Sequence, residues 1–366
     1  MNGGSTFNEI LAASTKCWQE RKADEFLVSL AMPIKGVDPL KQLPVLAENQ
    51  QFSFLWDRIP GLCIAATGQC QHLDLAGTQR FEVAQRFCDE TFDQLVDLAP
   101  EAPLHALPRV LLAFSFFEQS STQNRSIEDQ PAVQAVLPRW QLTNQENSAW
   151  LRVNAVINHE SHAREVAEHL WMMSEKLSQV NSSIEEKFSS IIHKPSVLSV
   201  LPNWQDSYRS ALLRGIELVN SSELDKLVLA ARQSITLKEP LDPLLMLTRL
   251  RDQQSASCRF LWQTNSNESF FGASPERLLS LSGGQIRIDA LAGTANRDDD
   301  GNGLFRSEKN LREHESVVSS IINQLIGQGL EPFRPKGPQL AKQGHLLHLH
   351  TPIVASARGK LPLHLV

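Results

Sequence analysis

Two residues suited to acid–base chemistry stand out in the second half of the chain. Lys226 lies in the segment 224–230, at the start of an apolar run that we expect to form a strand. Glu276 lies on a predicted turn between the apolar pairs 270–271 and 278–279. A desolvated lysine has a lowered pKa and can act as a base, while a carboxyl group can act as the matching acid. Each also has a plainer interpretation, in which Lys226 points to water and Glu276 pairs with a neighbouring base.

Three further residues could contact a small ligand. Gly293 and Thr294 stand in the segment Ala-Leu-Ala-Gly-Thr, where glycine lets a ligand approach the backbone N–H groups and threonine adds a hydroxyl donor. His348 shares one face of a predicted strand with His350. An ordinary turn and simple packing are the alternatives at these positions.

Glu313 is the candidate ligand of a metal ion. It begins an apolar stripe, since Val317, Ile321 and Leu325 follow at spacings of four on a predicted helix. A carboxylate at the start of a buried stripe is costly unless it is paired or binds a cation. Carboxylate oxygens suit hard cations such as Mg²⁺, and a pair with Arg312 or His314 is the alternative.

Two patterns look like metal sites but do not fulfil the requirements. His159 and His162 are three residues apart, one fewer than the spacing of the zinc motif HExxH, so this segment is read as a solvated polar face. Residues 298–303 match the first half of a calcium-binding loop, but Lys309 stands where that loop needs a bidentate glutamate. A polar surface loop is the better interpretation.

The elements that must position these residues alternate between strands and helices. Helical periodicity and capping signals predict helices over 1–23, 78–96, 159–189, 204–219, 243–252 and 308–327. Short runs of β-forming residues predict strands over 26–30, 52–56, 62–66, 110–114, 150–153, 227–237, 259–264, 269–272 and 346–356. Gly283 and Gly284 predict a hairpin turn. We expect a strand-rich part over 1–195 and a catalytic part over 196–366, intertwined in one domain.

Composition narrows the class of protein. The 366 residues carry a formal net charge of -6, which gives no basic field for a nucleic acid. The five cysteines have no CxxC pair and are expected to be free thiols in a reducing compartment. The sequence shows neither a secretory signal nor an apolar run long enough to span a membrane, so we expect a cytoplasmic protein.

Taken in order, five segments make the chain similar to the chorismate-utilising enzymes. They are LDKLVLA (224–230), FFGASPERLL (270–279), ALAGTANR (290–297), SEKNLREHESVV (307–318) and LLHLHTPI (346–353). The resemblance covers residues 204–366 strongly. In the N-terminal part, PRVLLAFSFF and VLPRWQL resemble the longer, menaquinone-pathway type of isochorismate synthase. The resemblance implies an α+β fold of large, mostly antiparallel sheets packed in a sandwich with helices outside.

The resemblance also implies a role for each candidate residue. Lys226 matches the general base of isochorismate synthases, where anthranilate synthases carry glutamine, and Glu276 matches the family's general acid. Glu313 matches a ligand of the Mg²⁺ cofactor, and Gly293, Thr294 and His348 match positions that contact chorismate.

The implied reaction is the conversion of chorismate to isochorismate. The base would deprotonate a water that attacks C2, the acid would protonate the C4 hydroxyl as it leaves, and Mg²⁺ would hold the C1 carboxylate. Menaquinone or phylloquinone biosynthesis is the expected pathway, and a monomer is the expected state. Salicylate synthase, an anthranilate synthase-like enzyme and a non-catalytic binding protein are the alternatives, and salicylate with pyruvate would be the products of the first.

Two departures from the family pattern bear on activity. Asn310 stands where some members carry an additional acidic residue, which removes an auxiliary ligand. The segment that follows in the family, with a motif like LHPTPAVGG and a second glutamate ligand, is not found in these residues. We therefore expect the chain to be incomplete at its C-terminus and to have little activity.

Overall fold

The computed structural model describes residues 7–21, 25–47, 52–58, 61–116, 131–179, 195–200, 204–224, 226–296 and 301–357. These residues divide into two compact units, of which one comprises Met1–Phe188 with Leu244–Val366 and the other comprises Ser189–Pro243. The predicted division at residue 195 stays a prediction.

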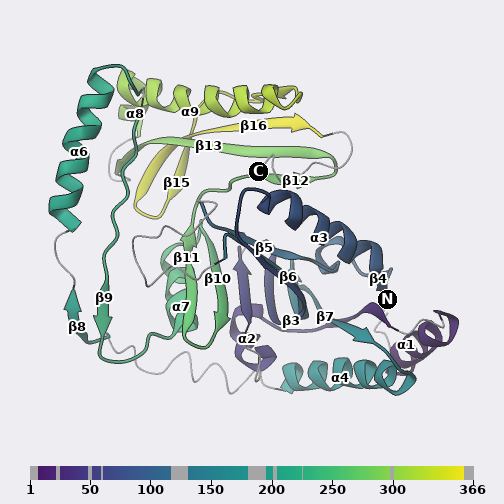
Figure 1. The fold of residues 1–366 in the computed structure, drawn as a ribbon. Helices are drawn as coiled ribbons and strands as arrows, with labels where there is room; N and C mark the ends of the chain where they lie inside the picture. Colours follow the sequence, from purple (N-terminus) through teal and green to yellow (C-terminus); the bar gives the residue numbers. More distant parts are fainter. Residues whose placement is uncertain are drawn as a thin grey trace. The chain divides into compact units, whose positions relative to one another are not determined.

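A nine-stranded sheet forms the larger part of the first unit (Figure 1). Its order is β11-β10-β2-β3-β6-β7-β1-β4, and β5 pairs with β6. The strands are β1 (Phe26–Ile34), β2 (Ser53–Asp57), β3 (Cys63–Leu75), β4 (Leu95–Asp97), β5 (Leu111–Phe114), β6 (Val133–Gln145), β7 (Ser148–Ile157), β10 (Cys258–Asn265) and β11 (Glu268–Ser274). Neighbours run antiparallel except β1 and β4, which are parallel. Strands from both halves of the sequence therefore share one sheet.

Five helices accompany this sheet. They are α1 (Phe7–Arg21), α2 (Pro39–Ala47), α3 (Arg80–Gln94), α4 (Glu160–Gln179) and α7 (Pro243–Gln253). Helix α3 packs on β3 and β6. Residues of the other four join the strands in one apolar cluster, in which Leu30, Leu151, Leu170 and Leu247 are almost fully buried. Burying side chains of this size stabilises the unit by about 2 kcal/mol each.

A buried ionic cluster joins β2, β10 and α7. Asp57 and Arg259 are both fully buried, and Arg259 Nη2 lies 3.0 Å from Asp57 Oδ2. Arg251 Nε donates to the same carboxylate at 2.8 Å, and the Arg251 guanidinium also pairs with Asp38. These four charges tie the N-terminal strands to elements about two hundred residues later.

A second, five-stranded sheet carries the candidate ligand-binding segments. It consists of β12 (Ser280–Ser282), β13 (Gln285–Asn296), β14 (Pro332–Phe333), β15 (Gln339–Gln343) and β16 (Leu346–Ser356), with β13 and β16 paired along their length. Helices α8 (Asn302–Arg306) and α9 (Glu308–Gly327) pack on it, and α9 lies along β13 and β16 (Figure 1). Ala290, Val318 and Ile353 meet in the apolar layer between α9 and the strands.

The second unit contains β8 (Val197–Val200), α6 (Trp204–Asn220) and β9 (Ile235–Leu237), and β8 and β9 pair antiparallel. The strand predicted over 227–237 is wrong except for its last three residues. Residues 226–234 have no strand partner within the described chain, and Val228 is 77% exposed. A β-rich composition alone does not make a strand, because a strand requires a partner to complete its backbone hydrogen bonds.

The predicted α+β class is confirmed, and most element positions agree. The helix over 308–327 and the strand over 346–356 have the predicted bounds. Gly283 and Gly284 take φ values of +57° and +71° in the predicted hairpin turn. The end of the helix predicted over 159–189 lies outside the described residues, as do residues 297–300 of the polar loop. No described helix is long and apolar enough to cross a membrane.

Candidate functional site

A β-bulge in β13 shapes the segment around Gly293. The pairing with β16 shifts register between Ala292 and Thr294, so Gly293 has no direct partner across the ladder. Its φ is +78°, a conformation that favours glycine. A Cβ atom at this position would lie 3.4 Å from Leu349 Cδ1 and 3.5 Å from the Cβ of Asn310. Glycine therefore permits both the bulge and the close approach of β13 to the first turn of α9.

Thr294 and His348 form a hydrogen-bonded pair beside the bulge. They are opposite each other on β13 and β16, and Thr294 Oγ1 lies 3.0 Å from His348 Nδ1, where the imidazole tautomer decides which atom donates. The neighbouring residues Leu347 and Leu349 are buried under α8 and α9, so His348 belongs to the opposite face of the sheet. A hydroxyl, an imidazole and the bulge backbone thus offer polar contacts on one surface.

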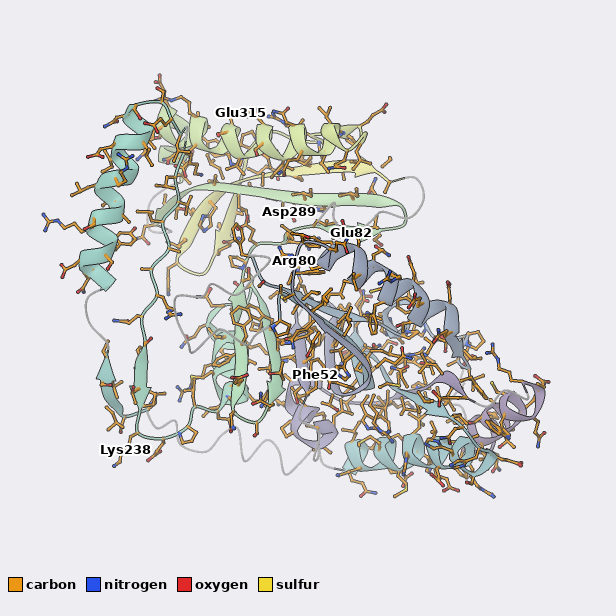
Figure 2. All side chains as sticks on the ribbon, in the orientation of Figure 1. Phe52, Arg80, Glu82, Lys238, Asp289 and Glu315 are labelled. Atoms are coloured by element: carbon orange, nitrogen blue, oxygen red, sulfur yellow. The ribbon has the colours of Figure 1, made fainter. Side chains whose placement is uncertain are left out.

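The same face continues along the two strands with a hydrogen-bonded group whose carboxylate, Asp289, was not among the predicted site residues. His350 Nε2 lies 2.9 Å from Asp289 Oδ1, and Arg287 Nε donates to that oxygen at 3.2 Å. Asp289 is labelled in Figure 2. Strand alternation predicts its direction. The next residue, Ala290, is buried under α9, so the Asp289 side chain projects from the other face of the sheet, as His350 does.

Helix α9 brings Glu313 to the bulge end of the sheet. Ser307 caps the helix by accepting the Asn310 N–H at 3.3 Å. Glu313 is half-buried and lies one turn after Asn310, the residue whose side chain approaches Gly293. This exposure agrees with a carboxylate at the start of the apolar stripe formed by Val317, Ile321 and Leu325.

His314 is one of the buried residues of α9. It is 1% exposed, and its Nε2 lies 2.7 Å from Oγ1 of Thr351 on β16. Burial lowers the pKa of His314 below its ordinary value, so the ring is neutral at neutral pH. Arg312 Nε donates to the Glu308 carbonyl at 3.4 Å, and the pairing of Glu313 with Arg312 or His314 stays a prediction.

The two proposed acid–base residues lie elsewhere in the chain. Glu276 follows β11 in the first unit, is exposed, and accepts a 3.2 Å hydrogen bond from Ser274 Oγ through its backbone carbonyl. Lys226 belongs to the second unit and is also exposed. Its neighbour Leu227 packs on Gly215 of α6, where an added Cβ would lie 2.5 Å from Leu227 Cδ2. The roles of Lys226 and Glu276 stay predictions.

The donor set for a metal ion is small. Within the described ranges, no three His, Cys, Asp or Glu side chains gather as a potential metal site. Near His159 the imidazole instead caps α4, since Nδ1 accepts the His162 N–H at 2.9 Å. Glu313 alone still fits Mg²⁺ in part, because this ion is held by one or two carboxylates and takes its other ligands from water and substrate.

The first unit therefore gathers four of the six predicted site residues on three adjoining elements. Gly293 and Thr294 lie on β13, His348 lies on β16, and Glu313 lies on the α9 turn that follows Asn310. The backbone, a hydroxyl, an imidazole and a carboxylate thus supply hydrogen-bond donors and acceptors, which suits a polar, oxygen-rich ligand.

Several known proteins are similar to this chain. A family model described as "Chorismate binding enzyme" matches residues 12–366. Isochorismate synthase MenF of Bacillus subtilis is 35% identical over 161 residues, which are 42% of this chain and 34% of that protein. Isochorismate synthase MenF of Haemophilus influenzae is 28% identical over 280 residues, 74% of this chain and 61% of that protein. The matched segments thus cover about a third to three fifths of these relatives.

Solved structures share the fold. The structure of MenF, the menaquinone-specific isochorismate synthase from Escherichia coli, superimposes with a TM-score of 0.66 at 20% identity, covering 98% of this chain and 79% of that one. The structure of DhbC from Bacillus anthracis gives a TM-score of 0.59 at 17% identity, covering 90% of this chain and 74% of that one.

Proposed function

Because this chain belongs to the family of chorismate binding enzymes, we propose that it converts chorismate to isochorismate. The observation that carries the proposal is the Thr294–His348 pair beside the Gly293 bulge, placed next to the α9 turn that bears Glu313. The two MenF relatives described above are named isochorismate synthases, which supports this reaction over the other reactions of chorismate enzymes.

Lys226 and Glu276 divide the proton transfers between them in this proposal. The Lys226 amine takes a proton from a water molecule as the water oxygen bonds to C2 of the ring. Glu276 gives its proton to the C4 hydroxyl, the C4–O bond breaks, water leaves, and the ring double bonds shift. One water enters and one leaves, so the product is an isomer of the substrate. Each transfer accelerates the reaction by about a hundredfold or more.

The β13–β16 surface holds the substrate. The backbone at Gly293, the Thr294 hydroxyl and the His348 imidazole donate hydrogen bonds to substrate oxygens and fix the orientation of the ring. Lys226 remains the residue that argues against an anthranilate synthase, because it stands where those enzymes carry glutamine.

Magnesium is the proposed cofactor. Glu313 would supply one carboxylate ligand, and bound Mg²⁺ supplies positive charge that offsets the negative charge of a substrate carboxylate. The menaquinone or phylloquinone pathway is the proposed destination of the product, supported by the MenF relatives and the menaquinone-specific fold neighbour.

The direct test incubates the purified chain with chorismate and Mg²⁺ and separates the products by liquid chromatography. We expect isochorismate from the native chain, at the low activity predicted from the sequence, and a further loss of about a hundredfold or more in kcat for Lys226→Gln and for Glu276→Gln. Lys238→Gln and Glu268→Gln are matched controls, since both side chains are exposed and lie in the same units as the residues they control for.

Three results would contradict the proposal. Salicylate with pyruvate would indicate a salicylate synthase, and anthranilate formed with ammonia would indicate an anthranilate synthase-like enzyme. Chorismate binding without any product would indicate a non-catalytic member of the family.

A further inference from the structure

We propose that the buried His314–Thr351 hydrogen bond positions the candidate substrate surface by fixing the rotation of α9 on β13 and β16. The inference rests on the proposed function for its catalytic consequence, while its structural part stands on the contacts alone. His314 and Thr351 are positioning residues here, because their mutual bond is buried between α9 and the sheet, whereas Thr294 and His348 project from the other face of the sheet.

The bond joins two groups that have almost no access to water. His314 is 1% exposed and Thr351 is 0% exposed, and the Nε2–Oγ1 distance is 2.7 Å. The other buried residues of α9 are Val318 and Leu325, whose apolar contacts are non-directional. A hydrogen bond depends on both distance and angle, so this bond defines one rotation of the helix where apolar packing alone would allow several.

The rotation of α9 determines where Glu313 lies. Consecutive helical residues are about 100° apart around the axis. When His314 points at β16, the carboxylate of Glu313 is held to one side of the helix. Asn310, one turn earlier, is then placed against Gly293, where an added Cβ would be 3.5 Å from the Asn310 Cβ. The bond thereby links the proposed cation ligand to the bulge.

The bond also holds the strand that carries His348. Thr351 pairs with Ala290 on β13, and His348 pairs with Thr294 at the bulge end of the same two strands. Side chains alternate along a strand, so Thr351 points to α9 while His348 and His350 point away. The buried contact therefore joins α9 to β16, and the ladder between β16 and β13 links it to the third element.

Thr351→Val tests the inference because it removes the hydroxyl and keeps the shape of the side chain. We expect faster backbone hydrogen exchange over residues 288–296 and 308–316 and a fall of about tenfold or more in kcat/KM for chorismate. Thr351→Ser keeps the hydroxyl and should restore both readouts to within about twofold. His314→Gln, which can still donate to Thr351, should fall between the two.

Thr67→Val is the matched control. Thr67 is also a fully buried strand threonine, and its Oγ1 donates to the carbonyl of Leu46 on α2 at 3.1 Å, so this bond too joins a strand to a helix. It should lower the melting temperature as Thr351→Val does, yet leave exchange at 288–296 and 308–316 and the kinetic constants unchanged.

The outcomes separate this inference from the proposed function. If Thr351→Val behaves like Thr67→Val, or if Thr351→Ser fails to restore exchange and kinetics, the positioning role is wrong. If the native chain neither binds nor converts chorismate, the proposed function fails, and the exchange comparison still decides whether the bond positions α9.

Discussion

Two of the buried polar clusters in the first unit differ in purpose. At the β2–β10 junction, Asp57 and Arg259 are fully buried, and Arg251 lies against the same carboxylate. At the small sheet, the buried polar contact is a neutral His314–Thr351 bond, and the polar groups beyond it are partly exposed. Buried charges are costly unless paired, so the charges of the first cluster pair with one another and hold the strands together. The second leaves donors and acceptors on an open face, as a ligand requires.

The largest effect is expected at the first cluster. Asp57→Asn leaves the guanidinium groups of Arg251 and Arg259 buried with less compensation, and should lower the free energy of unfolding by about 3–5 kcal/mol. Asp74→Asn removes a carboxylate that is exposed on β3, and should change it by less than about 0.5 kcal/mol. Urea denaturation followed by circular dichroism measures both. If Asp57→Asn and Asp74→Asn have equal free energies of unfolding, the Asp57 cluster does not hold the strands together as described.

At the bulge we expect a smaller loss of stability than at Asp57 but a larger loss of turnover. Gly293→Ala forces a side chain into φ +78° and into the space beside Asn310 and Leu349, and should cost about 1–3 kcal/mol of stability. Because the added Cβ meets α9, chorismate turnover should fall with it. Gly283→Ala has a similar backbone penalty, at φ +57°, with nothing within 4 Å of the new Cβ. This control should lose stability and keep turnover, and parallel losses of turnover would break the comparison.

The smallest effect on stability at neutral pH is expected from the thiols near the first cluster. Burial, the largest cause, and the nearby Asp57 carboxylate raise the pKa of Cys63 well above its ordinary value, and burial raises the pKa of Cys258 to about 12. The unfolded thiols ionise first, so stability from these groups is complete below about pH 9 and declines as pH rises above it. Titration with Ellman's reagent at about pH 8 should be slow for the native chain and fast after denaturation.

Fast reaction of Cys63 in the native chain would show that the β2–β10 junction opens readily. The β2–β10 junction would then be accessible to solvent, as the partly exposed face of the small sheet is, and the contrast between the two would fail.

The sequence was most informative where local signals were strong. The paired glycines at 283 and 284 and the apolar stripe of α9 predicted those elements at their observed positions. Helix α2 was missed because Pro44 lies inside it, and proline is a poor helix interior residue. Its start was readable, since Asp38 accepts the Leu40 N–H and so caps the helix.

The candidate site was predictable only as a set of residues. Motif order selected Gly293, Thr294, Glu313 and His348, and the structure brings these four onto adjoining elements. The bulge, the Asp289–His350 pair and the His314–Thr351 bond depend on how β13 and β16 register, which involves residues about sixty positions apart. No local pattern encodes such a pairing. For Lys226, the same limit made a β-rich run look like a strand.

The pairing of β2 with β10 has a consequence for synthesis on the ribosome. Strand β2 is complete at Asp57, yet its partner begins only at Cys258. Roughly ten seconds or more of elongation separate the two, at about 5–20 residues per second. During that interval the nascent chain presents an unpaired strand edge, and Asp57 lacks its arginine partners. The first half should therefore depend on chaperones to avoid aggregation until α7 and β10 emerge.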